Sequence, residues 1–135
     1  MISIEIRPAA GGRDGYLRAE GHAETAGNGK DLICAAVSCL IGTLQANLEL
    51  CWGVGVRSQK RAGFGDVRWF KTDRRGHGMH RANLAAGFAY NGLRALSEVY
   101  PGAVQVRWLP GGSDSRQELA AVHGKGNEDD DSRRD

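Results

Sequence analysis

The chain has 135 residues, of which 41% are hydrophobic and 25% are charged. These values are typical of one soluble globular domain with its own core, and the length excludes two such domains. The formal net charge of +2 is unevenly distributed, because residues 111–135 hold seven acidic and four basic residues, which leaves +5 on residues 1–110. We expect a moderately basic folded domain over residues 1–109 and a polar, disordered tail over residues 110–135.

The first part of the chain predicts a β-hairpin followed by a long helix. Residues 1–7 alternate apolar and polar side chains, as in a strand with one buried face, and a glycine-rich turn leads to a return strand over residues 16–21. Apolar residues then recur at helical spacing from Leu32 to Cys51, and Asp31 is in position to cap this helix. The residues expected on its buried face are Ile33, Val37, Leu40, Leu44, Leu48 and Cys51.

The second part predicts two strands, a helix and a last strand. The strands are expected over residues 54–61 and 67–72, the helix over residues 81–100, and the last strand over residues 103–109. The residues of the second helix that we expect to face the core are Leu84, Phe88, Leu96 and Tyr100. The element order is therefore ββαββαβ, which predicts an α+β fold, a two-layer α/β sandwich with one mixed sheet covered by two helices.

The cysteines and the apolar segments bear on the location of the protein. Cys34, Cys39 and Cys51 all fall on the first predicted helix, where they are held too rigidly to pair with one another. Free thiols indicate a reducing compartment. The N-terminal residues lack the pattern of a signal peptide, and Gln45 interrupts the apolar stretch that starts at Leu32 before it reaches about 18 residues. We expect a cytoplasmic protein outside the membrane.

Cys34 and His22 form a candidate catalytic pair. A thiol close to the start of a helix is exposed to the positive end of the helix dipole, which favours the nucleophilic thiolate. The dipole contributes only about 0.3–1 kcal/mol, so activation also requires a charged neighbour, and protonated His22 is the nearby candidate. The two are twelve positions apart, and a loop rich in small residues lies between them. On spacing alone, Cys34 is either a nucleophile or a packed core residue.

Asp31 has two alternative roles. As a helix cap, its carboxylate would accept a hydrogen bond from the backbone amide of Cys34, three residues later. As a partner of His22, it would orient the imidazole and leave the amides at the start of the helix free to stabilise an oxyanion. The sequence does not distinguish these roles.

Two other groups of residues are candidate sites of a different kind. His77 and His80 could bind a metal ion with Cys34 or Cys39, but no set of four ligands is apparent, so we expect a polar loop and no metal site. The segment from Arg57 to Arg81 mixes basic and aromatic residues, as RNA-binding proteins do, but carries no known nucleic-acid motif. This basic face of the middle strands supports an alternative function, a non-enzymatic ribosome- or RNA-associated module in which Cys34 is only packed.

Two short motifs resemble one known family. They are Gly21-His22-Ala23 and Gly29-Lys30-Asp31-Leu32-Ile33-Cys34-Ala35-Ala36-Val37-Ser38. Together they are similar to the signature of the bacterial ribosomal-processing cysteine proteases, in which Gly-His-Ala precedes Gly-x-Asp, two apolar residues, Cys-Ala and a serine. The resemblance extends over roughly residues 1–109 and includes the ββαββαβ order.

The resemblance implies an activity, a substrate and a set of site residues. Cys34 would be the nucleophile and His22 the general base of a cysteine-type endopeptidase, with Asp31, Gly21, Gly29 and Ser38 in supporting positions. The substrate would be a precursor of large-subunit ribosomal protein number twenty-seven, whose N-terminal extension is removed during ribosome maturation. The resemblance also implies a homodimer and no cofactor, and it does not lead us to expect direct RNA binding.

Overall fold

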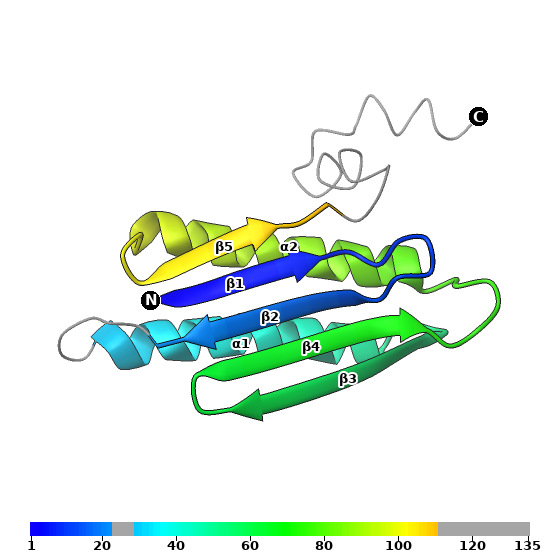
Figure 1. Ribbon diagram of the computed structural model, residues 1–135, viewed down its shortest axis with the longest axis horizontal. Coiled ribbons are helices and arrows are strands. Elements are labelled where there is room, and N and C mark those ends of the chain that lie inside the picture. Colours follow the sequence, from blue (N-terminus) through cyan, green and yellow to red (C-terminus); the bar gives the residue numbers. More distant parts are fainter. Residues whose placement is uncertain (23–28, 111–135) are drawn as a thin grey trace, which may run out of the picture.

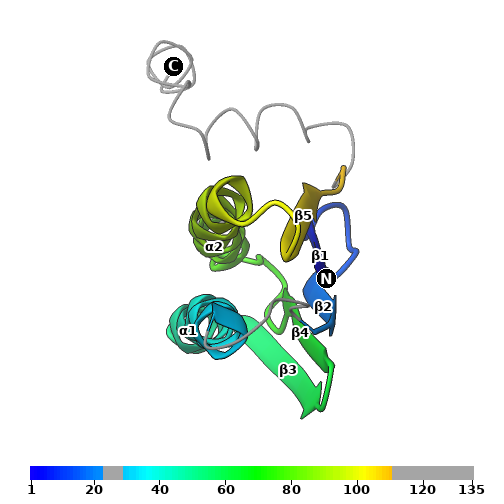
Figure 2. The same ribbon diagram turned by 90° about the vertical axis from the view of Figure 1, so that its left-hand side faces the viewer.

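The predicted architecture is confirmed. The structure is a computed structural model that describes residues 1–22 and 29–110, without the side chains of residues 29–31. The elements in chain order are β1 (Ile2–Arg7), β2 (Gly15–Gly21), α1 (Gly29–Glu49), β3 (Val54–Arg61), β4 (Phe64–Lys71), α2 (Met79–Val99) and β5 (Val104–Trp108). The strands form one mixed sheet in the order β3-β4-β2-β1-β5, with β1 and β5 parallel and the other neighbouring strands antiparallel. Both helices lie on one face of the sheet, as Figure 1 and Figure 2 show. The disorder predicted for the tail concerns residues outside the described ranges.

Alternating strand residues and one side of α1 form the core. The fully or almost fully buried side chains include Ile4 and Ile6 of β1, Leu17 of β2, Val67 and Trp69 of β4, and Ile33, Val37, Leu44 and Leu48 of α1. Leu40 and Cys51 are partly buried and pack against this core. The predicted buried positions of the first helix are therefore confirmed, because a strict helical spacing leaves one choice of inward face.

The inward face predicted for the second helix is wrong for Phe88 and Tyr100, whereas Leu96 is partly buried and packs against the core. Phe88 is 70% exposed and Tyr100 is 38% exposed, while the buried side of α2 is made of small residues and one leucine. These buried residues are Ala82, Ala86, Gly87, Ala89 and Leu93. Apolar residues occur on two sides of this helix, and the side with small residues faces the sheet because it allows the helix backbone to approach closely.

Several element boundaries also differ from the predicted ones. The first helix begins at Gly29 and ends at Glu49, so Asp31 lies inside its first turn and Cys51 lies beyond its end. The fourth strand begins at Phe64, three residues earlier than predicted, because the connection from β3 is a two-residue turn. Gly63 in this turn has a φ of +74°, a conformation that glycine adopts without strain.

The segment Leu32–Glu49 of α1 is long and apolar enough to cross a membrane, with a mean hydropathy of 1.5 over 18 residues. The sequence predicted no such run because polar residues interrupt it, but the surrounding apolar residues keep the mean hydropathy of the segment high. Core helices of soluble proteins have the same length and composition, and the inward side chains of α1 pack against the sheet. The composition of α1 therefore does not by itself indicate a membrane span.

Asn83 of α2 joins the helical layer to two segments of the sheet. Its side-chain amide donates to the carbonyl of Ala9 at 2.8 Å, and its carbonyl oxygen accepts from the amide of Ala9 at 2.9 Å. The same oxygen accepts from the indole N–H of Trp69 at 3.2 Å, and Trp69 is fully buried. One side chain therefore satisfies three polar groups of the surrounding protein.

Replacing Asn83 tests this junction. Asn83→Ala leaves a buried indole donor and the backbone groups of Ala9 without partners, so we expect the free energy of unfolding to fall by about 2–4 kcal/mol. Urea denaturation measures the loss, provided that the slope of the unfolding free energy against urea concentration is the same for both proteins. Gln105→Ala, on the exposed side of β5, is the control and should change stability by less than about 0.5 kcal/mol. Equal effects of the two substitutions would contradict the role assigned to Asn83.

Candidate active site

His22 and Cys34 line one cavity at the end of the sheet where β2 ends, α1 begins and β3 turns into β4. This end is on the left of Figure 1. The cavity has a volume of about 550 Å³, and its walls come from α1 and from the β3–β4 hairpin. Many of its lining residues are small: Ala19, Gly21, Ser38, Gly42, Ser58, Ala62, Gly63 and Gly65.

His22 is positioned by the backbone around it. It follows β2 directly, and the preceding residue, Gly21, has a φ of +105° and donates from its amide to the carbonyl of Gly63 at 2.9 Å. The carbonyl of His22 accepts a hydrogen bond from the amino group of Met1 at 2.7 Å. The imidazole lies against Gly63, because a Cβ on that glycine would come within 2.7 Å of His22 Nε2. The side chain is exposed to solvent, so it is accessible to a substrate.

Cys34 is the sixth residue of α1 and is half-buried between the core residues Ile33 and Val37. The expectation that it lies close to the helix start requires correction, because α1 begins earlier than predicted and the effect of the dipole falls off within the first turn. The Cα–Cβ bonds of a helix tilt toward its N-terminus, which directs the side chain of Cys34 back toward the first turn. Activation by a neighbouring charge is therefore more important for this thiol than the dipole is.

Asp31 is not the N-cap of α1. It is the third helical residue, and the amide of Cys34 is far enough into the helix to pair with the carbonyl four residues before it. The amides without helical partners belong to the first residues of α1, which include Gly29 and Asp31. The side chain of Asp31 lies outside the described residues, so its predicted partnership with His22 stays a prediction.

Gly21 and Ser38 border the same cavity as His22 and Cys34, and Ser38 lies one turn of α1 after Cys34. The contact of His22 with Gly63 was not predicted from the sequence, in which Gly63 and Gly65 fall between the strands expected over residues 54–61 and 67–72. Two glycines between these expected strands could have indicated such a contact, because glycine allows another group to approach the backbone closely.

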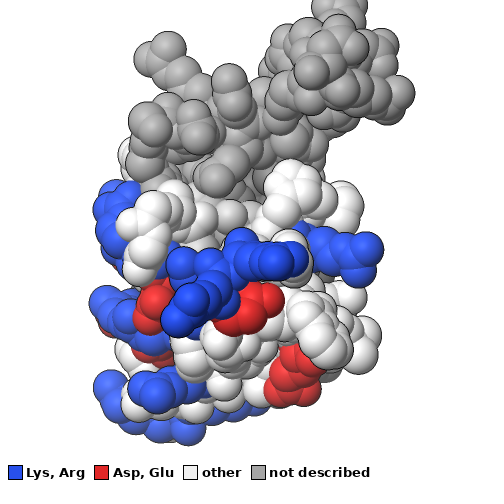
Figure 3. Space-filling view, turned by 90° about the vertical axis from the view of Figure 1, so that its right-hand side faces the viewer, with Lys and Arg blue, Asp and Glu red and all other residues white. Residues whose placement is uncertain are grey.

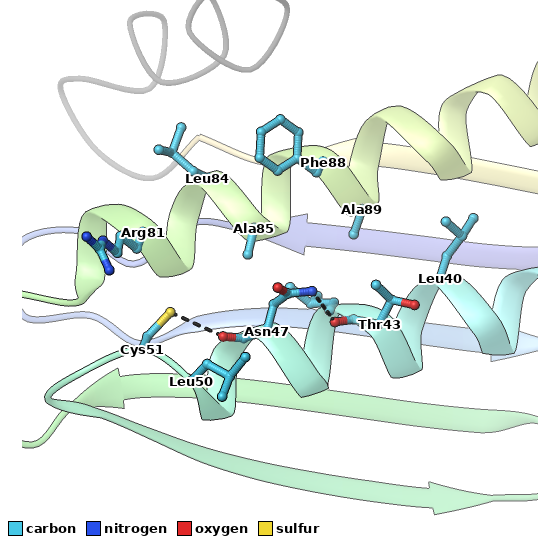
Figure 4. Close-up of a pocket in the computed structure, with 11 residues that line it drawn as sticks. Leu40, Thr43, Asn47, Leu50, Cys51, Arg81, Leu84, Ala85, Phe88 and Ala89 are labelled. Carbon is cyan, nitrogen blue, oxygen red and sulfur yellow. Dashed lines mark hydrogen bonds between the residues drawn. The ribbon is translucent and has the colours of Figure 1, made fainter.

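The other two thiols lie outside this cavity. Cys39 is exposed on α1. Cys51 borders a second cavity, of about 540 Å³, between the outer sides of α1 and α2 (Figure 4). Its thiol donates to the carbonyl of Asn47 at 3.3 Å, and burial raises its pKa despite the opposing effect of the Arg81 charge.

His77 and His80 are both exposed, close to the start of α2. No three His, Cys, Asp or Glu residues lie close enough to hold a metal ion in the described part of the chain.

A family model described as cysteine protease Prp matches residues 1–105. A search of the curated proteins found no match.

Among solved structures, the chain is similar to the protein SMU.848 of Streptococcus mutans, with 24% identity and a TM-score of 0.59 over 81% of this chain and 94% of that one. It is also similar to the essential ribosomal processing protease Prp from S. aureus in complex with a substrate peptide, with 18% identity and a TM-score of 0.62 over 81% and 100% of the two chains. The structure of the S. aureus protease with a covalently linked product peptide has 15% identity, a TM-score of 0.59 and the same coverage. At these identities the solved structures show a shared fold.

Selective alkylation tests whether Cys34 is the activated thiol. A limiting amount of iodoacetamide near neutral pH should label Cys34 first, then Cys39, and Cys51 last, because a raised pKa leaves less thiolate on Cys51 at that pH. Peptide mass spectrometry of the folded protein gives the order. In the His22→Ala protein, Cys34 should be labelled no faster than Cys39. Equal labelling of the three thiols in the wild-type protein would contradict an activated nucleophile.

Proposed function

The chain belongs to the cysteine protease Prp family, and on this premise we propose that it removes the N-terminal extension of large-subunit ribosomal protein number twenty-seven during ribosome maturation. The observation that carries the proposal is the single cavity lined by His22 and Cys34, the two residues of the family-like motifs that can serve as base and nucleophile. The alternative of a non-enzymatic module is wrong, because the family is one of proteases.

In the proposed mechanism, His22 accepts the proton of the Cys34 thiol, and the thiolate attacks the carbonyl carbon of the scissile peptide bond. The tetrahedral intermediate collapses as the imidazolium donates its proton to the leaving amine, which departs. Water then hydrolyses the thioester and regenerates the thiol. We assign the stabilisation of the oxyanion to backbone amides in the first turn of α1, because these amides lack helical partners and the side chain of Cys34 tilts toward them.

The shape of the cavity favours an extended peptide as the substrate. Its walls are a helix and a hairpin, and the glycines and other small residues between them leave room for a backbone rather than for one large side chain. Among the described residues, no atom lies within 4 Å of where a Cβ on Gly42 or Gly65 would stand, so there is open space beside these two lining residues. The S. aureus protease of the same fold is described with a substrate peptide, which supports a peptide ligand for this chain as well.

We also propose a cytoplasmic homodimer. All three thiols are free, as expected in a reducing compartment. The second cavity has apolar walls with Arg81 as its one charged lining residue, and Phe88 and Leu50 beside it are 70% and 82% exposed. A second copy of the same surface would cover these apolar side chains.

Substitution of the catalytic pair tests the mechanism. Cys34→Ala and His22→Ala should each reduce cleavage of the extended ribosomal protein at least about a thousandfold, as for other nucleophile–base pairs. Gel electrophoresis of the trimmed product measures the rate, and circular dichroism checks that the fold is retained. Cys39→Ala removes an exposed thiol of the same helix and should cleave at the wild-type rate.

The outcomes separate the mechanism from the substrate. Cleavage by Cys34→Ala at the wild-type rate would contradict the assignment of the nucleophile. A wild-type enzyme that cleaves other peptides but not this precursor would contradict only the proposed substrate. In the same assay, Asp31→Asn should slow cleavage if Asp31 orients His22, and should leave the rate nearly unchanged if it does not.

The dimer has a separate test. Phe88→Asp places a charge in the apolar groove, so light scattering should give the mass of one chain where the wild-type protein gives the mass of two. Val99→Asp is the matched control, because Val99 is 67% exposed on the same helix but does not line the groove. A wild-type protein that stays monomeric at high micromolar concentration would contradict the proposed dimer.

A further inference from the structure

The sheet face opposite the helices carries a row of cationic and aromatic side chains. The registers place Arg7 of β1 beside Tyr16 of β2, Tyr16 beside Arg68 of β4, and Arg68 beside Arg57 of β3. These four residues therefore form one line across four strands. Figure 2 shows that neither helix covers this face.

Arginine side chains stack on the aromatic rings of this row. The guanidinium carbons of Arg7, Arg68 and Arg18 lie 4.7, 5.5 and 5.6 Å from the centre of the Tyr16 ring. The guanidinium of Arg57 lies 5.4 Å from the centre of the neighbouring Phe70 ring. These contacts hold the guanidinium groups over the sheet and beside the aromatic rings.

A basic cavity adjoins the row at the end of the sheet opposite the catalytic residues. It has a volume of about 660 Å³ and lies between the β1–β2 turn, β3, β4 and the start of α2. Its charged lining residues are Arg13, Arg57, Arg68, Lys71 and Arg75, with Asp14 as the one carboxylate. Lys and Arg side chains cover much of this end of the molecule, with smaller acidic areas between them (Figure 3).

Few of these charges are neutralised inside the protein. Arg68 pairs with the buried carboxylate of Asp66 at 3.3 Å. Within the described ranges, Arg13, Arg57, Lys71 and Arg75 have no carboxylate within ion-pair distance. At the other edge of the sheet, by contrast, Arg107 of β5 pairs with Glu5 of β1. The positive charge is therefore concentrated on β3, β4 and the two turns beside them.

We infer that this surface binds single-stranded RNA. The basic cavity supplies cations for phosphate groups, and the stacked guanidinium planes and rings supply flat surfaces for unpaired bases. An acidic peptide would use the charges but not the planar groups. The choice of RNA as the nucleic acid rests on the proposed function, because a ribosomal protein precursor is surrounded by ribosomal RNA.

The position of the surface is compatible with proteolysis. His22 and Cys34 lie at the end of the sheet where β2 finishes, whereas Arg13, Lys71 and Arg75 lie at the end where β2 begins. No residue lines both cavities. Bound RNA would therefore leave the catalytic cavity open and would hold the enzyme on an RNA-rich particle while a protein segment enters the cavity.

Fluorescence anisotropy with a labelled single-stranded RNA of about ten nucleotides tests the inference. The double variant Arg57→Gln with Arg75→Gln should bind at least tenfold more weakly, and the slope of log affinity against log salt should decrease by roughly 1.4, at about 0.7 per lost phosphate contact. Tyr16→Leu should weaken binding about tenfold with an unchanged slope, because it removes a stacking platform and no charge.

The control is Arg94→Gln with Arg107→Gln, which removes the same charge from outside the basic cavity and should bind RNA like the wild-type protein. Equal weakening by both double variants, or a peptide of ten glutamates that competes as well as the RNA, would overturn the inference. The measurement requires no proteolysis, so a failure to bind RNA leaves the proposed protease unaffected, and an inactive protease leaves the RNA test valid. Unchanged peptide cleavage by the Arg57→Gln, Arg75→Gln protein would confirm that the two sites are separate.

Discussion

The hydrogen bonds of Asn83 join the helical layer to the sheet, and these two layers form the walls of the cavity at His22 and Cys34 and of the basic cavity. Asn83 holds the segment after β1 through Ala9 and the middle of β4 through the indole of Trp69. The indole in turn packs so closely over Gly15 that no side chain fits there. These contacts link β1, β2, β4 and α2 at one point, and they set how far α2 and its neighbour α1 stand from the strands. The catalytic cavity needs this separation, because α1 forms one of its walls and β3–β4 forms the other.

The sequence predicted the element order because that order depends on local patterns. The catalytic roles of His22 and Cys34 stay a prediction, and the structure places both residues at one cavity. Alternation marks the strands, and a regular helical spacing gives the inward face of α1. The inward face of α2 could not be predicted in the same way, because large apolar residues such as Phe88 compete with alanines that allow closer packing. The start of α1 was misplaced because Gly29 and Lys30 are not typical of a helix start, so Asp31 was the first recognisable cap. The contact between His22 and Gly63 depends on the pairing of the second and fourth strands, which a single sequence does not give.

The basic surface was only partly visible in the sequence, for a related reason. Arg57 and Arg68 come from the segment that was recognised as basic and aromatic, but Arg7 and Tyr16 come from the first hairpin. Only the strand registers bring them into one row. The strand pairing, and not closeness in the sequence, therefore brings the basic residues together. The basic cavity and the cavity at His22 and Cys34 lie at opposite ends of the strands.

The parallel pair of β1 and β5 has a consequence for the biosynthesis of the protein. The amide of Ile2 donates to the carbonyl of Ala103, and the amide of Leu109 donates to the carbonyl of Ile6. The strand β1 is therefore synthesised about a hundred residues before β5, the strand that pairs with it. Until then one edge of β1 is open and its isoleucines lack part of their cover, a state prone to pairing with other chains. Long separations of this kind also slow folding. We therefore expect the sheet of a nascent chain to be completed only after its last strand has left the ribosome.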